Sequence, residues 1–105
     1  MPQYMLTYLG GEQPATPEEG KLHFAKYKIW LATLGSAMVS PANLLKSTQT
    51  VNSDGSVSVG GTTGMSGFTL IDVESMEQAL VHAKACPFLE IGGSLEVSEL
   101  VQVKM

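Results

Sequence analysis

The sequence contains no arginine, and its six basic residues, all lysines, stand against ten acidic residues, for a formal net charge of −4. Nucleic-acid binding depends on basic side chains that pair with phosphates, so this balance argues against a nucleic-acid partner. The absence of guanidinium groups also removes the side chain that best holds a carboxylate or a phosphate through two parallel hydrogen bonds.

Cysteine is almost as scarce, because Cys86 is the only one in the chain. An internal disulfide is therefore excluded, which is typical of proteins in a reducing compartment. No apolar run approaches the roughly 18 residues of a membrane-spanning helix, and the first residues lack the basic region of a signal peptide. We expect a cytoplasmic protein that does not contact a membrane.

The chain of 105 residues has the length of one domain, and it contains no long linker, so residues 1–105 are predicted to form a single unit. Thr16-Pro17-Glu18-Glu19 is a typical helix start, Pro41 and Pro87 prevent helix continuation, and Asn52-Ser53-Asp54-Gly55 is a strong turn signal. Hydrophobic periodicity then predicts strands at 4–9, 44–51, 66–73 and 94–103, a short hairpin arm at 56–59, and helices at 17–36 and 74–85.

This order of elements, β-α-β-β-α-β, is that of the ferredoxin-like α+β fold. Two helices would cover one face of an antiparallel sheet and leave the other face free. An apolar free face requires a partner, since large exposed apolar patches mark interfaces. Packing of two such sheets face to face would give a homodimer, a dimeric α-β barrel.

Several segments match a known family in their order and spacing. They are Tyr4-Met5-Leu6, Trp30, Leu34-Gly35, Ser53-Asp54-Gly55, Gly67-Phe68-Thr69-Leu70-Ile71, Ala79, Ala83-Lys84-Ala85-Cys86-Pro87 and Gly92-Gly93-Ser94-Leu95-Glu96-Val97. With these pieces the chain resembles the YCII-related family of small dimeric α-β barrel proteins. The resemblance implies a ferredoxin-like fold and a homodimer, in a family where most activities are unknown.

Two features depart from the family pattern. Many relatives have Asp-Gly-Pro-Phe, whereas here Asp54-Gly55 is followed by Ser56-Val57. Relatives with a proposed activity pair a histidine on the first helix with an aspartate shortly after it. His23 matches that histidine, but no acidic residue occurs between Gly20 and Asn52.

His23 is the sharpest candidate for a site, because it shares a helix face with Tyr27, Trp30 and Leu34, and a histidine can act as acid, base or ligand. It can equally be a half-buried structural residue. Tyr27 and Trp30 would offer hydrogen bonds to a ligand or would be core residues with polar tips. Asp54 is the carboxylate that family analogy suggests, or only a turn former. By fold analogy, Ser47 would line the mouth of the pocket.

Three functions stay open from the sequence. The leading hypothesis is a small-molecule-binding protein with a pocket between the first helix and the sheet. The first alternative is a cofactor-independent enzyme of lyase or oxygenase type that uses His23 as acid or base. The second is a structural or regulatory interaction module without a pocket. The spacing of Cys and His supports no metal site, Cys86 is expected to be a structural thiol at a helix C-terminus, and no motif for a cofactor is found.

Overall fold

A computed structural model describes residues 2–11 and 15–101 of the chain. The elements follow in the order β1 (Gln3–Gly10), α1 (Pro17–Leu34), η1 (Gly35–Ala37), β2 (Met38–Leu44), β3 (Gln49–Val51), β4 (Val57–Val59), β5 (Met65–Asp72), α2 (Met76–Lys84), η2 (Pro87–Ile91) and β6 (Gly93–Glu99).

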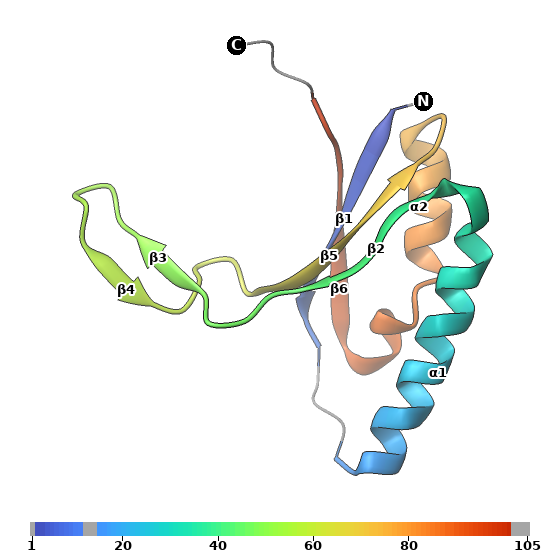
Figure 1. Cartoon of the computed structure of the whole chain (residues 1–105), viewed down its shortest axis with the longest axis horizontal. Helices are drawn as coiled ribbons and strands as arrows, with labels where there is room; N and C mark the ends of the chain where they lie inside the picture. Colours follow the sequence, from blue (N-terminus) through green and yellow to red (C-terminus); the bar gives the residue numbers. More distant parts are fainter. Residues whose placement is uncertain (1, 12–14, 102–105) are drawn as a thin grey trace.

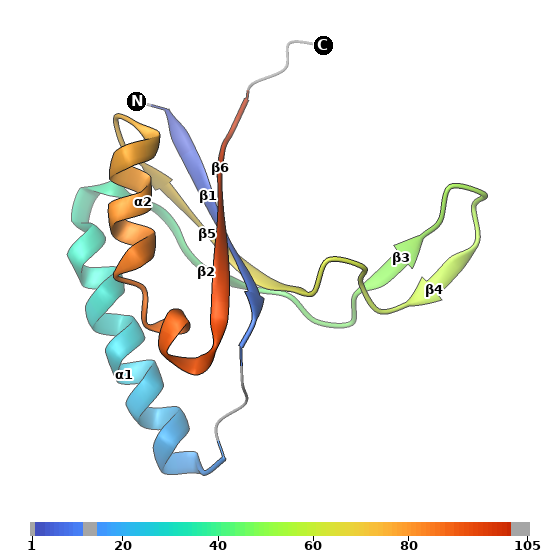
Figure 2. The ribbon, with the colours of Figure 1, turned by 180° about the vertical axis from the view of Figure 1, so that it is seen from behind.

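Four of the strands form one antiparallel sheet in the order β2-β5-β1-β6. Both helices lie on the same face of this sheet, and the opposite face is uncovered (Figure 1 and Figure 2). The strand order and the one-sided helices are those of a ferredoxin-like α+β fold, as the order of elements predicts. None of the described helices is long and apolar enough to cross a membrane.

The first helix begins where its sequence predicts. The Thr16 hydroxyl accepts a hydrogen bond of 3.1 Å from the backbone N–H of Glu19, and the Glu19 carboxylate accepts one of 2.9 Å from the N–H of Ala15. These bonds satisfy N–H groups that have no partner inside the helix. The helix ends at Leu34, a little before the predicted end.

The sequence prediction of the second strand is wrong. Residues 44–51 were expected to form it, but the strand in the main sheet is Met38–Leu44, and it contains Pro41. A proline removes one donor from the ladder, which an edge strand tolerates because one of its sides has no neighbour. β2 is such an edge strand, and its register with β5 shifts on both sides of Ser40.

The turn at residues 52–55 forms as predicted, and it joins β3 and β4 into a separate two-stranded sheet. This hairpin projects away from the helices and the main sheet (Figure 1 and Figure 2). Its three valines are largely in water, with exposures of 72% for Val51, 60% for Val57 and 95% for Val59.

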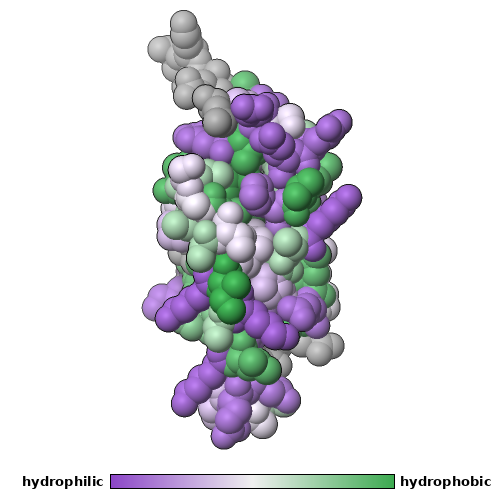
Figure 3. Space-filling view, turned by 90° about the vertical axis from the view of Figure 1, so that its right-hand side faces the viewer, coloured by the Kyte–Doolittle hydropathy of each residue, from purple (hydrophilic) through white to green (hydrophobic). Residues whose placement is uncertain are grey.

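The core lies between the helices and the sheet. Alternate residues of β1 point toward the helices, and Tyr4, Leu6 and Tyr8 are therefore at most 3% exposed. From the helices, Trp30, Leu34, Ala79 and Ala83 complete this core. Phe24 of α1 is 58% exposed and lies outside this core, and Met38 belongs to β2 rather than to the first helix. The outer side of the helices mixes hydrophilic and hydrophobic residues (Figure 3).

Candidate functional site

A cavity of about 200 Å³ opens between the N-terminal half of α1 and the sheet. Its walls come from four parts of the chain: the end of β1, α1, the ends of β2 and β5 that meet at the hairpin, and η2. The lining residues are Tyr8, His23, Phe24, Tyr27, Leu44, Ser66 and Phe88.

Aromatic rings form most of the wall, and they pack on one another. Tyr8 meets Tyr27 edge to face with 6.0 Å between ring centroids, and it contacts the tilted ring of Phe88 at 5.2 Å. Tyr8 is 3% exposed, so its ring is fixed from several sides. Rigid aromatic walls around a space of this size suit a flat molecule of about one ring.

Three hydroxyl groups in this region form a hydrogen-bonded chain. The Tyr8 hydroxyl is hydrogen-bonded both to the Tyr27 hydroxyl and to Oγ1 of Thr69, and Thr69 Oγ1 in turn donates to the carbonyl oxygen of Pro41. Burial raises the pKa of Tyr8 and the pKa of Tyr27 above the ordinary value for a phenol. Both side chains therefore keep their protons at neutral pH.

His23 lies one helical turn before Tyr27, on the same face of α1, and its half-buried side chain lines the same cavity. It also lines a neighbouring hollow of about 300 Å³, at whose rim Lys26 and Glu90 form an exposed ion pair of 3.2 Å. Among residues 2–11 and 15–101, none forms a hydrogen bond with the His23 imidazole. Within the described part of one chain, His23 thus has no carboxylate partner.

The other predicted site residues lie outside this cavity. Asp54 sits in the exposed hairpin turn, on the far side of the molecule from α1 (Figure 1), and it accepts hydrogen bonds of 2.6 Å and 2.9 Å from Oγ and N of Ser56. These bonds lower the pKa of Asp54. Ser47 is exposed in the connection between β2 and β3. The Trp30 N–H donates to the carbonyl of His82 rather than into the cavity.

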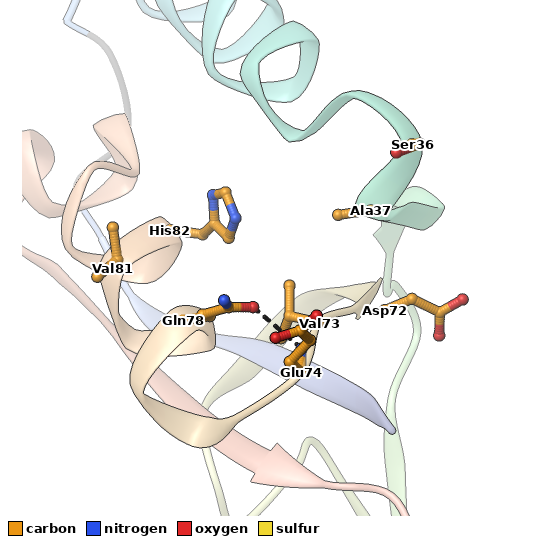
Figure 4. A pocket seen from close by; sticks show the side chains of 8 residues that line it. All are labelled: Ser36, Ala37, Asp72, Val73, Glu74, Gln78, Val81 and His82. Carbon is orange, nitrogen blue, oxygen red and sulfur yellow. Dashed lines mark hydrogen bonds between the residues drawn. The ribbon is translucent and has the colours of Figure 1, made fainter. Parts of the chain in front are cut away.

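A second hollow of about 570 Å³ lies between η1 and α2 (Figure 4). The His82 side chain projects into it from α2, and Gln78 accepts a 3.0 Å hydrogen bond from the N–H of Glu74 at its base. His82 is half-buried beside η1. One oxygen of Asp72 is buried without a partner among the described groups, and in Figure 4 this side chain points away from the others.

The described residues contain no group of three or more His, Cys, Asp or Glu side chains that could hold a metal ion.

The fold was compared with protein families, curated proteins and solved structures. No protein-family model matches the sequence, and no curated protein matches it. The fold is similar to the solved structure of 5-chloro-2-hydroxyhydroquinone dehydrochlorinase (TftG) from Burkholderia phenoliruptrix AC1100 in complex with 2,5-dihydroxybenzoquinone. The TM-score is 0.58 at 14% sequence identity, over 96% of this chain and 95% of that one. At this identity the likeness establishes the fold alone.

Among the residues that the sequence did not reveal are Tyr8 and Phe88, which line the cavity, and Thr69, which is hydrogen-bonded to Tyr8. Tyr8 stood in an apolar run and Thr69 in a strand, and both were taken as structural. The pairing of β1 with β5, which places Leu6 opposite Thr69 and Tyr8 opposite Gly67, brings these side chains to the helical face. The hydroxyl of Tyr8 was a usable signal, because a tyrosine hydroxyl in a buried strand usually has a hydrogen-bond partner.

Proposed function

We propose that the protein binds a small, flat, single-ring molecule in the cavity between α1 and the sheet. The observation that carries this proposal is the cavity itself, about 200 Å³ in volume and walled by Tyr8, Phe24, Tyr27 and Phe88. Such concave, mainly aromatic sites with a few polar groups are typical of small-molecule binding. The solved complex of TftG with a single-ring quinone supports it.

Two predicted residues have defined places in this proposal. Tyr27 supplies an aromatic ring and His23 supplies an imidazole to the lining of the cavity. Trp30 stiffens the wall from behind, because its ring centroid lies 5.5 Å from that of Tyr27. We assign no contact with the ligand to Asp54 or Ser47.

The cavity favours ligand binding over an interaction module without a pocket. The enzyme alternative, with His23 as acid or base, receives no specific support. Glu19 and Glu90 line the neighbouring hollow together with His23, but among the described residues no carboxylate forms a hydrogen bond or an ion pair with the imidazole.

We further propose that the chain is a YCII-related protein and that it forms a homodimer through the uncovered face of its sheet. In the middle of that face, Met5 pairs with Leu70 and Thr7 pairs with Phe68. Met5, Phe68 and Leu70 are only half-buried there, and a second copy would cover them. The cytoplasmic location stays a prediction, consistent with a cysteine content that needs no oxidising compartment.

The test of ligand binding is a titration followed by two-dimensional amide NMR, with 2,5-dihydroxybenzoquinone as the probe. Shifts of the amides of Tyr8, Tyr27 and Phe88 that saturate with one Kd are the expected result. Shifts confined to the amides around His82 and Gln78 would place binding in the second hollow and contradict the proposal. An absence of saturable shifts would contradict it as well.

A further inference from the structure

The hydroxyl groups of Tyr27, Tyr8 and Thr69 form a hydrogen-bonded chain with a fixed direction. Thr69 is 0% exposed and Tyr8 is 3% exposed, so bulk water does not reach their hydroxyls. The chain has three close contacts, namely Tyr27 to Tyr8, Tyr8 to Thr69, and Thr69 to the carbonyl of Pro41. A fourth contact, between Tyr27 and Thr69, is longer at 3.4 Å.

The carbonyl oxygen of Pro41 is the anchor of this chain. It can only accept a hydrogen bond, so Thr69 must donate its single hydroxyl proton to it. The position of this carbonyl follows from the irregular pairing of β2, whose register with β5 shifts between Ser40 and Asn43.

The remaining protons can be placed by counting. Three close contacts need three protons, and three hydroxyls supply three. With the proton of Thr69 given to Pro41, the contact between Tyr8 and Thr69 must be filled by the proton of Tyr8. The contact between Tyr27 and Tyr8 must then be filled by the proton of Tyr27. Any other arrangement leaves two oxygens in close contact without a proton between them.

This arrangement of protons determines how Tyr27 can bond to a ligand in the cavity. Tyr27 is half-buried and lines the cavity wall, and its only hydroxyl proton points backward to Tyr8. A ligand group that reaches this oxygen can therefore only donate a hydrogen bond to it. The raised pKa values of Tyr8 and Tyr27 keep this arrangement intact across neutral pH.

On this geometry we propose that the cavity selects ring compounds that carry an O–H or N–H donor over rings that can only accept a hydrogen bond. The inference rests on the proposed function and adds the chemical class of its ligand. A ring without a donor would cover the Tyr27 oxygen and leave it unpaired, which opposes binding. Thr69 acts as a positioning residue, because it sets the preference without lining the cavity.

The test compares phenol with anisole, a ring whose oxygen has no proton to donate, by NMR titration of the full chain. We expect phenol to bind about tenfold more tightly than anisole. In Thr69→Val, the Tyr8 proton loses its acceptor and turns to Tyr27, which frees the Tyr27 proton to point into the cavity. The ratio of the two Kd values should then fall toward one.

Thr7→Val is the matched control, since Thr7 is also a buried strand threonine, 6% exposed, but pairs with Phe68 on the other face of the sheet. It should keep the tenfold ratio. If Thr69→Val does not fold, Tyr27→Phe removes the accepting oxygen itself and should bring the ratio to about one.

The outcomes separate the two proposals. Equal binding of phenol and anisole by the unmodified protein overturns the donor preference and leaves ligand binding standing. An unchanged ratio of the two Kd values in a folded Thr69→Val or Tyr27→Phe variant does the same. Failure of both probes to bind at the cavity overturns the proposed function and this inference with it.

Discussion

The indole N–H of Trp30 on α1 donates a hydrogen bond of 2.8 Å to the backbone carbonyl of His82 on α2. The Trp30 side chain is only 4% exposed, so this bond lies at the buried junction of the two helices. Its ring packs on Tyr27, which lines the cavity. The contact between the helices thus also fixes the back of the candidate site.

Replacement of Trp30 with Phe should lower the free energy of unfolding by about 2 kcal/mol, because a buried carbonyl loses its donor and the core loses volume. Urea denaturation followed by circular dichroism measures this. His82→Ala is the control, since it keeps the carbonyl that Trp30 uses and should change stability by less than about 1 kcal/mol. Equal stability of Trp30→Phe and the unmodified protein would show that the bond does not hold the helices together.

Local signals in the sequence predicted local structure well. The start of α1 at Thr16, the turn at residues 52–55 and the helix at residues 76–84 all follow from capping, turn chemistry or periodicity within a few neighbouring residues. The order of these elements was enough to predict the ferredoxin-like arrangement, because few topologies bury two amphipathic helices on one sheet.

Local signals in the sequence could not predict the hydrogen-bond partners of individual polar groups. The acceptor of the Trp30 N–H is a backbone carbonyl 52 residues away, and nothing in the local pattern identifies it. Asp54 was joined to His23 by family analogy, while the hairpin carries it to the opposite side (Figure 1). The second strand was misplaced because Pro41 was taken only as a stop signal, although edge strands accept proline.

His23→Ala should weaken ligand binding while the fold stays intact. The half-buried imidazole lines the cavity but makes no hydrogen bond to the described residues, so its removal should cost less than about 1 kcal/mol of stability. Thermal melts and the quinone titration measure the two effects. His82→Ala, which removes the other histidine of the chain, should leave Kd unchanged. Severe unfolding of His23→Ala would assign this residue a structural role.

Leu70→Lys should convert a dimer to a monomer. Leu70 pairs with Met5 in the middle of the uncovered sheet face, where a lysine would bury its charge in an interface. Sedimentation velocity measures the mass of each species. Leu22→Lys, on the exposed side of α1 at 60% exposure, is the matched control and should remain dimeric. A monomeric unmodified protein at micromolar concentration would overturn the proposed dimer.

Gly93→Ala should disturb the wall of the cavity. A Cβ atom at Gly93 would lie 2.1 Å from Cε2 of Phe88, so the ring would have to leave its place against Tyr8. We expect a loss of about 1–3 kcal/mol of stability and weaker ligand binding. Gly61→Ala is the control, because its Cβ would meet only the exposed side chain of Thr48 at 3.2 Å. A Gly93→Ala variant that matches Gly61→Ala in both measurements would show that Phe88 can move freely.

Cys86 should make the folded state sensitive to alkaline pH. Its thiol is 2% exposed, and burial raises its pKa from 9.0 to about 11. Because the unfolded chain loses this proton at lower pH than the folded chain, the stabilisation is complete below pH 9. It is lost as the pH rises toward 11. The Tm measured between pH 7 and 11 should therefore fall more steeply with pH for the unmodified protein than for Cys86→Ala. All other side chains are the same in the two proteins, so the difference between the two slopes isolates the thiol. Identical slopes would mean that the thiol ionises as easily in the folded chain as in the unfolded one, which its burial among core residues opposes.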